Sequence, residues 1–132
     1  MKVVLDSNIF VSSFFWAGNP RKVFDRVTNG FDELYITDEI LNEIASVMLC
    51  KKFEVNEDAI EEYIKIIDSY STKLSSKNIL DGVSRDKDDN KVLQCGVDGN
   101  VGFIITGDND LLVIKEYKKI RIMKPKDYLD LL

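Results

Sequence analysis

The sequence predicts an α/β protein whose central parallel sheet is covered by helices on both faces. Apolar, β-branched runs without polar alternation recur along the chain, as in strands that are buried on both sides; residues 2–5 and 103–106 are the clearest. Segments with apolar residues at helical spacing separate these runs. Helices that alternate with such strands are typical of parallel sheets with crossover connections.

The first half of the chain alternates strand and helix signals. Pro20 suits the first turn of a helix, Gly30 suits the residue after its end, and Thr37 is a good N-cap for the next helix. The expected elements are, in order, a strand at residues 2–5, a helix at 21–28, a strand at 33–37 and helices at 38–50 and 56–69.

The second half begins with weaker signals. Residues 71–85 show no clear pattern beyond a short strand and a loop, and Gly96 and Gly99 weaken the end of the helix that follows. The expected elements are, in order, a charged turn at residues 85–90 that opens a helix through Cys95, strands at 103–106 and 120–123, and a closing helix at 125–132.

Length and composition fit one domain over residues 1–132, since this is close to the commonest domain size. No run reaches the ~18–20 apolar residues that a membrane span requires, and Asp6 interrupts the start too early for a signal peptide. Cys50 and Cys95 lack the close spacing of a disulfide framework or a zinc site. We therefore expect a cytoplasmic protein that does not insert into a membrane.

The absence of histidine excludes several classes of catalyst. Ser-His-Asp and Cys-His catalysis and histidine-ligated zinc are ruled out, so hydrolysis must use carboxylates, hydroxyls, lysines or a bound cation. The net charge of −5 disfavours binding to nucleic acid by bulk attraction. This charge fits either an ordinary acidic surface or a group of acids that cations neutralise.

Four acids from distant segments are expected to meet at one edge of the sheet. Asp6 directly follows the first strand and Asp108 follows the clearest later strand, and ligands of open parallel sheets bind beyond the carboxyl ends of the strands. Asp89 opens the helix before that later strand, and Glu43 flanks the apolar stripe of the mid-chain helix. Oxygen ligands without His or Cys select hard ions such as Mg²⁺ or Mn²⁺.

Each acid also has an ordinary structural explanation. Asp6 fits a helix N-cap, Glu43 fits a solvated helix surface, and Asp108 and Asp110 fit a turn. The acids that fit a role in complementing a helix dipole are Asp86, Asp88 and Asp89. Like charges about 4 Å apart repel by roughly 1 kcal/mol even in water, so gathering such acids costs stability unless a cation offsets it. The combination therefore favours a metal site.

Four segments resemble the PIN-domain family, in particular its toxin-like, VapC-type ribonuclease branch. The segments are residues 3–9, 37–43, 85–93 and 105–112, so the resemblance covers essentially the whole chain. It rests on the order and spacing of the four segments, because each alone is a weak signal. The resemblance implies a three-layer α/β/α fold around a central parallel sheet, and cleavage of single-stranded RNA with Mg²⁺ or Mn²⁺.

The resemblance also implies roles for individual residues. The implied catalytic metal ligands are Asp6, Glu43, Asp89 and Asp108, with Asp110 as a further ligand. Asp89 is favoured over Asp86 and Asp88 by the position of the apolar pair that follows it. The residues that look like groups orienting carboxylates or water are Ser7, Asn8, Thr106 and Asp86. The implied reaction is attack of metal-bound water on an RNA phosphodiester, which leaves a 5′-phosphate and a 3′-hydroxyl.

Partners are less defined by the sequence. The candidate RNA contacts are Arg21, Lys22, Lys51, Lys52, Arg85 and Lys87, although a solvated surface position is the commoner role for any one of them. The family resemblance implies an antitoxin partner and a homodimer, and the aromatic run at residues 14–16 fits either core or interface.

Two other functions fit parts of this sequence. The first is a PIN fold that acts as a non-catalytic RNA- or protein-binding module. The second, a phosphohydrolase or phosphotransferase, is disfavoured because Asp6 lacks the Asp-x-Asp arrangement of such nucleophiles.

Overall fold

A computed structural model describes residues 1–50, 55–75 and 87–132 of the chain, without the side chains of Lys87 and Asp88. The strands are β1 (Lys2–Leu5), β2 (Glu33–Thr37), β3 (Ser71–Leu74), β4 (Phe103–Ile105), β5 (Glu116–Tyr117) and β6 (Ile120–Met123). The helices are α1 (Ser7–Phe15), α2 (Asn19–Thr28), α3 (Asp38–Cys50), α4 (Glu57–Ser69), α5 (Lys87–Gly99), α6 (Asn109–Leu112) and α7 (Pro125–Asp130). The expected strands and helices are confirmed to within a few residues at their ends.

The six strands form one sheet in the order β3-β2-β1-β4-β6-β5. Every neighbouring pair is parallel except β5 and β6, which form an antiparallel hairpin at one edge. The expected parallel sheet is thus correct for its central strands and wrong for its last edge. The chain runs outward from β1 to β3 and then crosses back to β4, so the direction of the connections reverses between β1 and β4.

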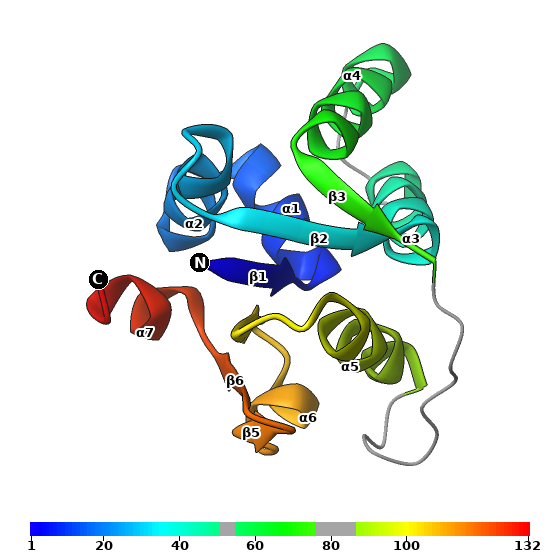
Figure 1. Ribbon diagram of the computed structural model, residues 1–132. Coiled ribbons are helices and arrows are strands. Elements are labelled where there is room, and N and C mark those ends of the chain that lie inside the picture. The colour runs from blue at the N-terminus through cyan, green and yellow to red at the C-terminus, as the bar shows by residue number, and fades with distance from the viewer. Residues whose placement is uncertain (51–54, 76–86) are drawn as a thin grey trace.

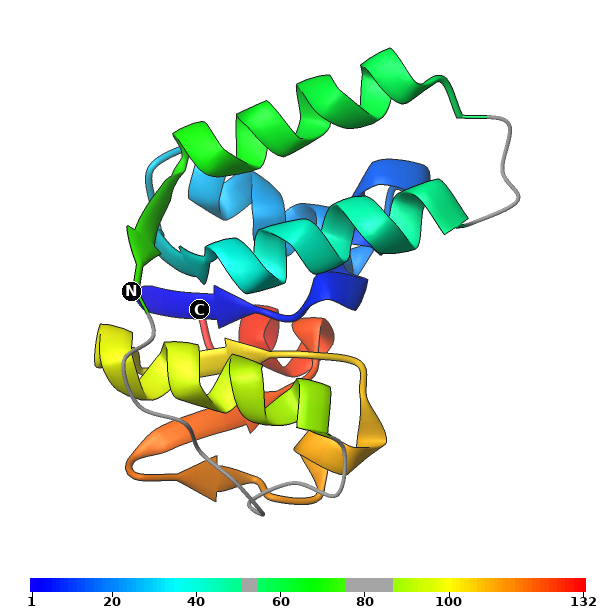
Figure 2. The ribbon, with the colours of Figure 1, turned by 90° about the vertical axis from the view of Figure 1, so that its right-hand side faces the viewer.

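Helices cover both faces of this sheet. Crossovers between parallel strands are right-handed, so the connections from β1 to β3 lie on one face and the return from β3 to β4 lies on the other. On the return face, α5 packs against β1, β2 and β4, whereas α1 packs against α2 and α3, and α2 contacts α7. Figures 1 and 2 show α5 across the sheet from α1 and α2. The three-layer α/β/α expectation is confirmed.

Helix α1 is an element that the sequence analysis did not identify. Four of its nine residues are polar, but the buried ones are Ile9, Phe10, Val11 and Ser13, so it lacks the one-sided apolar pattern of a surface helix. It ends in the aromatic run at residues 14–16, in which the first two rings pack partly against the core while Trp16 is 55% exposed. Arg21 of α2 donates to the carbonyl oxygens of Ser13 and Phe14, at 2.8 and 3.1 Å.

Helix α5 lies unusually close to the sheet. A Cβ atom at Gly96 would lie 2.9 Å from Cδ1 of Ile104, and one at Gly99 would lie 3.2 Å from the ring of Tyr35. The two glycines, which weaken the helix by propensity, are therefore explained by close packing on β4 and β2. This contact brings the first turn of α5 to the carboxyl edge of the sheet.

No helix among the described residues is both long and apolar enough to cross a bilayer. Cys50 is exposed and Cys95 is buried, and both are free thiols. Burial raises the pKa of Cys95 to about 12, so this thiol is inert at neutral pH.

Candidate metal centre

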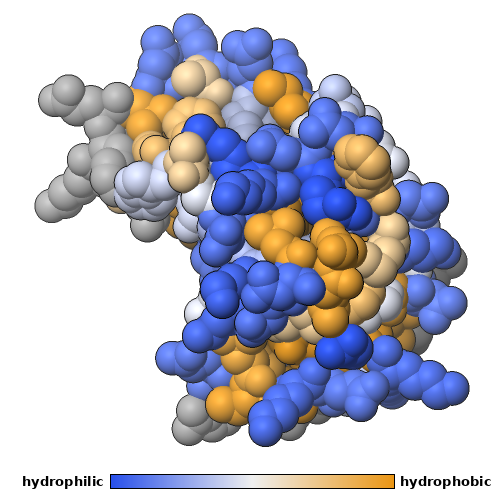
Figure 3. All heavy atoms as spheres, turned by 90° about the vertical axis from the view of Figure 1, so that its left-hand side faces the viewer, coloured by the Kyte–Doolittle hydropathy of each residue, from blue (hydrophilic) through white to orange (hydrophobic). Residues whose placement is uncertain are grey.

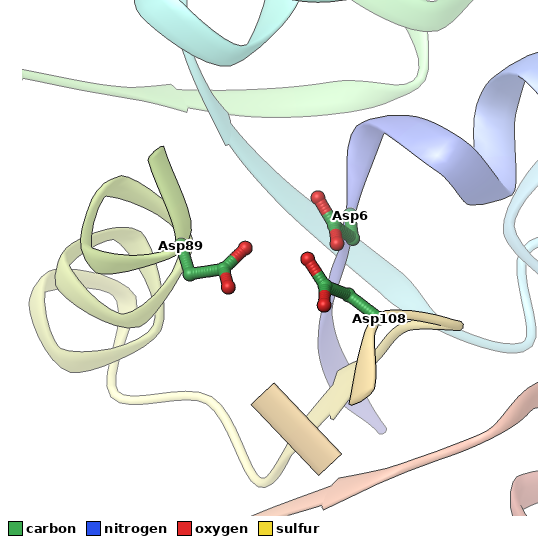
Figure 4. Close-up of side chains that lie close together, drawn as sticks. All are labelled: Asp6, Asp89 and Asp108. Carbon is green, nitrogen blue, oxygen red and sulfur yellow. The ribbon is translucent and has the colours of Figure 1, made fainter. Parts of the chain in front are cut away.

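Three carboxylates converge at the carboxyl edge of the sheet. Asp6 follows β1, Asp108 follows β4, and Asp89 lies in the first turn of α5. One carboxylate oxygen from each lies within 4.8 Å of the others, and Figure 4 shows the three side chains pointing toward one another. Because β1 and β4 are neighbours across which the connections reverse, this is the place where an open α/β sheet binds its ligands.

Asp6 is a buried carboxylate that is held in place by surrounding donors. Its side chain is 6% exposed. It accepts hydrogen bonds from the amide of Ser7 at 2.8 Å, from Nδ2 of Asn8 at 3.3 Å and from Oγ1 of Thr106 at 2.7 Å. The expected helix N-cap and the expected site residue are therefore the same group, since Asp6 caps α1 while facing the other two acids.

Thr106 connects Asp6 to Asp108. Leu5 pairs with Ile105 in the sheet, which sets Asp6 and Thr106 side by side, and Thr106 is fully buried. Its hydroxyl donates to Asp6 and accepts from the amide of Asp108 at 3.0 Å, and a carboxylate oxygen of Asp108 accepts from the amide of Asp110 at 2.9 Å. A continuous chain of hydrogen bonds thus fixes two of the three carboxylates relative to each other.

Replacing Thr106 by valine is expected to loosen this chain without changing the shape of the side chain much. Asp6 would lose its shortest side-chain donor and the partly buried amide of Asp108 its acceptor, which should cost about 1–3 kcal/mol of unfolding free energy. Groups that orient ligands typically contribute 10–100-fold to metal affinity, so calorimetric Mn²⁺ binding should weaken by about that factor. Unchanged Mn²⁺ affinity would show that Thr106 acts only in folding.

Asp89 and Asn90 are both buried at the start of α5, with exposed fractions of 4% and 5%. Asp89, whose side chain the structure describes, lies beside Asp6 and Asp108. Asp86 and the side chain of Asp88 lie outside the described residues. Asn90 was not singled out from the sequence, because a polar residue in a charged turn gives no sign that it will be buried.

Glu43 and Asp110 lie outside the three-oxygen group. Glu43 is half-buried on α3, a helix that packs against both α1, which begins beside Asp6, and α5, which carries Asp89. Asp110 is half-buried in α6 and adjoins the group through its backbone bond to Asp108.

The donor set suits a hard divalent cation. Three carboxylates this close repel one another, by roughly 1 kcal/mol per pair in water and more in a partly buried site. Asp6 and Asp89 are buried and so forgo much of the hydration that would otherwise reduce this cost, whereas Asp108 is half-buried. All three offer oxygen, and the side chains that donate to Asp6 carry a hydroxyl and an amide, which fits Mg²⁺ or Mn²⁺ rather than a thiol-seeking metal.

The basic residues expected to contact RNA are only partly placed. Arg21 is half-buried against the last carbonyls of α1, and Lys22 is exposed on α2. Lys51, Lys52 and Arg85 lie outside the described residues. Lys87 begins α5, but its side chain is not described.

Comparison with known proteins decides the family. The family model described as PIN domain matches residues 2–110. The chain belongs to the PIN-domain family. Among solved structures, this PIN-domain chain is similar to one in the crystal structure of VapBC2 from Rickettsia felis bound to a DNA fragment from their promoter. The TM-score is 0.62 and the identity 13%, over 92% of this chain and 97% of that one. No curated protein matches the sequence.

Proposed function

We propose that this PIN-domain chain is an Mg²⁺- or Mn²⁺-dependent endoribonuclease, working as one domain and as the toxin component of a toxin–antitoxin pair. The observation that carries the proposal is the convergence of Asp6, Asp89 and Asp108 at the reversal point of the sheet. Membership of the PIN family supports a nuclease, and the fold shared with a VapBC2 complex supports an antitoxin partner. The name of that complex says nothing about the RNA target.

The chain's residues have distinct parts in this proposal. Asp6, Asp89 and Asp108 would hold the ion, and Glu43, on the neighbouring helix α3, and Asp110 would be further ligands. When bound, the ion supplies Lewis-acid chemistry, lowering the pKa of water and neutralising charge that develops on the phosphate. Thr106, Ser7 and Asn8 keep the carboxylate of Asp6 fixed, so it does not have to reorganise during the reaction.

The test is a cleavage assay on a loop-containing RNA with purified protein. Endonucleolytic products are expected with Mg²⁺ or Mn²⁺ and none with EDTA, and the products should carry 5′-phosphates that a phosphatase removes. Cleavage that persists in EDTA would overturn the metal-dependent mechanism.

The main alternative is a PIN fold that binds RNA or protein without cutting. It predicts RNA binding, or a protein partner, with no cleavage over a panel of RNAs in either metal. Calorimetry distinguishes such a binding module from a protein that has no metal site, because a module with intact carboxylates still binds Mn²⁺. The gathering of three acids, two of them buried, favours the enzyme, since an ion would offset the repulsion among their carboxylates.

A further inference from the structure

The β5–β6 hairpin collects positive charge in an otherwise acidic chain. Six of the 18 basic residues lie between positions 115 and 126, with Glu116 as the one acid among them, while the whole chain carries −5. All six are exposed; they are Lys115, Lys118, Lys119, Arg121, Lys124 and Lys126. Among the described residues, Lys126 is the member of this group that forms an ion pair, with Asp130.

The backbone of the hairpin adopts conformations that lysine disfavours. Lys118 and Lys119 form its two-residue turn with φ of 48° and 69°, and Lys115 before β5 has φ of 65°. Turns with positive φ at both central positions favour Asn-Gly, and left-handed conformations are uncommon for other residues. Strained residues of this kind concentrate at functional sites, so the lysines at this turn call for an explanation beyond folding.

The hairpin begins at the carboxylate site and leads away from it. The carbonyl of Met123 accepts from the amide of Thr106 at 3.0 Å, and the amide of Ile122 donates to the carbonyl of Lys115 at 2.9 Å. Lys115 and Lys124 therefore lie at the same end of β6 as the three acids. Lys118 and Lys119 lie at the other end, roughly 10 Å away at about 3.3 Å per residue. Figure 2 shows α6 and the hairpin continuing from β4 in this way.

Two cations of this surface are set against aromatic rings. The guanidinium of Arg121 lies 6.0 Å from the ring centre of Phe103, and the ammonium of Lys118 lies 5.5 Å from that of Tyr117. The rings attract the cations at this edge of the sheet, and the cations stay exposed to water. The face that carries α2 and α7 has a different composition. Figure 3 shows apolar side chains among hydrophilic ones on that face.

We infer that this basic hairpin, Lys115 to Lys124, binds the phosphate backbone of the single-stranded RNA substrate and leads it into the carboxylate site. The inference rests on the proposed nuclease function. Salt limits electrostatic interactions to about 8–10 Å, so distant acids do not cancel the hairpin's local charge. The three acids would repel phosphate before an ion is bound, and a cationic surface beside them offsets that repulsion.

The experiment measures RNA affinity against salt concentration in the Asp6→Asn background with EDTA, so that cleavage does not interfere. The probe is a fluorescent single-stranded RNA of about a dozen nucleotides, a length within the usual site sizes. The near pair Lys115→Gln/Lys124→Gln and the far pair Lys118→Gln/Lys119→Gln each remove two charges. Lys2→Gln/Lys65→Gln is the matched control, since both lysines are exposed on other elements.

A contact with one phosphate of a single strand contributes ~0.7 to the slope of log affinity against log salt. Each hairpin pair removes two such contacts and is therefore expected to reduce the steepness of that slope by about 1.4. The two pairs combined should reduce it by about 2.8, and the control pair should leave it unchanged. As the RNA is shortened to a few nucleotides, the far-pair substitutions should stop affecting RNA affinity before the near-pair substitutions do. Thermal unfolding of each variant verifies that the fold is kept.

Three results would overturn the inference: no RNA binding by the parent protein, hairpin pairs that act no more strongly than the control, or equal hairpin-dependent binding of double-stranded DNA. These outcomes are separable from failure of the proposed function. Hairpin-dependent RNA binding without cleavage would support the binding surface and refute the enzyme. If the protein cleaves RNA with metal, and the hairpin substitutions change neither the cleavage rate nor the RNA affinity, the result would support the enzyme and refute the binding surface.

Discussion

Replacing Asp6 by asparagine is expected to abolish RNA cleavage and to remove the stabilisation of the fold by Mn²⁺. Groups that merely orient a metal ligand contribute 10–100-fold, so loss of a ligand charge should reduce cleavage by more than about a hundredfold. A ligand at 100 times its dissociation constant stabilises a protein by about 2.7 kcal/mol. The wild type should gain that amount in Mn²⁺, and Asp6→Asn should gain much less at the same concentration.

The control for this prediction is Asp127→Asn, which removes an equal charge from the exposed first turn of α7. It should behave as the wild type in cleavage and in thermal unfolding with and without Mn²⁺. Stability in EDTA is a second readout. Asp6→Asn relieves repulsion from Asp89 and Asp108 but disturbs hydrogen bonds at the same carboxyl group, so the two effects should largely offset each other. An Asp6→Asn protein that still cleaves RNA would place the active site elsewhere.

The strands and two of the three clustered acids were predictable because each depends on local sequence. A buried parallel strand is a continuous apolar run, and an acid just after such a run must lie at the carboxyl edge of the sheet. Asp6 and Asp108 satisfy this condition directly. The sequence did not show that β1 and β4 are neighbours, which depends on long-range pairing. Only that pairing turns two strand-end acids into one site.

Other parts of the site depend on contacts that leave no local pattern. Thr106 was singled out through the family resemblance, yet its part in joining two carboxylates follows from the register of β1 and β4. The turn of the β5–β6 hairpin escaped prediction because lysine is a poor residue for positive φ. Its basic character is visible in the sequence as a local excess of lysine, but a net charge summed over the chain conceals it.

Asp32 shows the same limit in the core. It is one of 23 acids in the sequence, and no motif marks it. In the structure its side chain is fully buried and accepts from Nε of Arg26 at 2.9 Å and from the hydroxyl of Tyr128 at 2.8 Å. Tyr128 is itself fully buried against Phe103 of β4. The carboxylate therefore joins the start of β2 to α7 across 96 residues of sequence.

Replacing Asp32 by alanine is expected to cost about 3 kcal/mol of unfolding free energy at neutral pH. The buried hydroxyl of Tyr128 would lose its acceptor, and Arg26 would lose the carboxylate to which it donates two hydrogen bonds. Asp25→Ala, which removes an exposed acid of α2, should cost no more than about 0.5 kcal/mol. Urea denaturation of the three proteins measures these differences.

The pH dependence separates charge from packing at this position. Burial alone raises the pKa of Asp32, but hydrogen bonds from Arg26, Tyr128 and the N-terminal amine, together with the charge of Arg26, outweigh it and hold the pKa below the ordinary value of 3.8. A carboxyl whose pKa is lower in the folded state contributes its full stability above 3.8 and loses it as the pH falls through the folded value. The deficit of Asp32→Ala, relative to Asp25→Ala, should therefore shrink in acid below 3.8. A deficit that stays constant there would mean that Asp32 stabilises the fold by filling space and not by its charge.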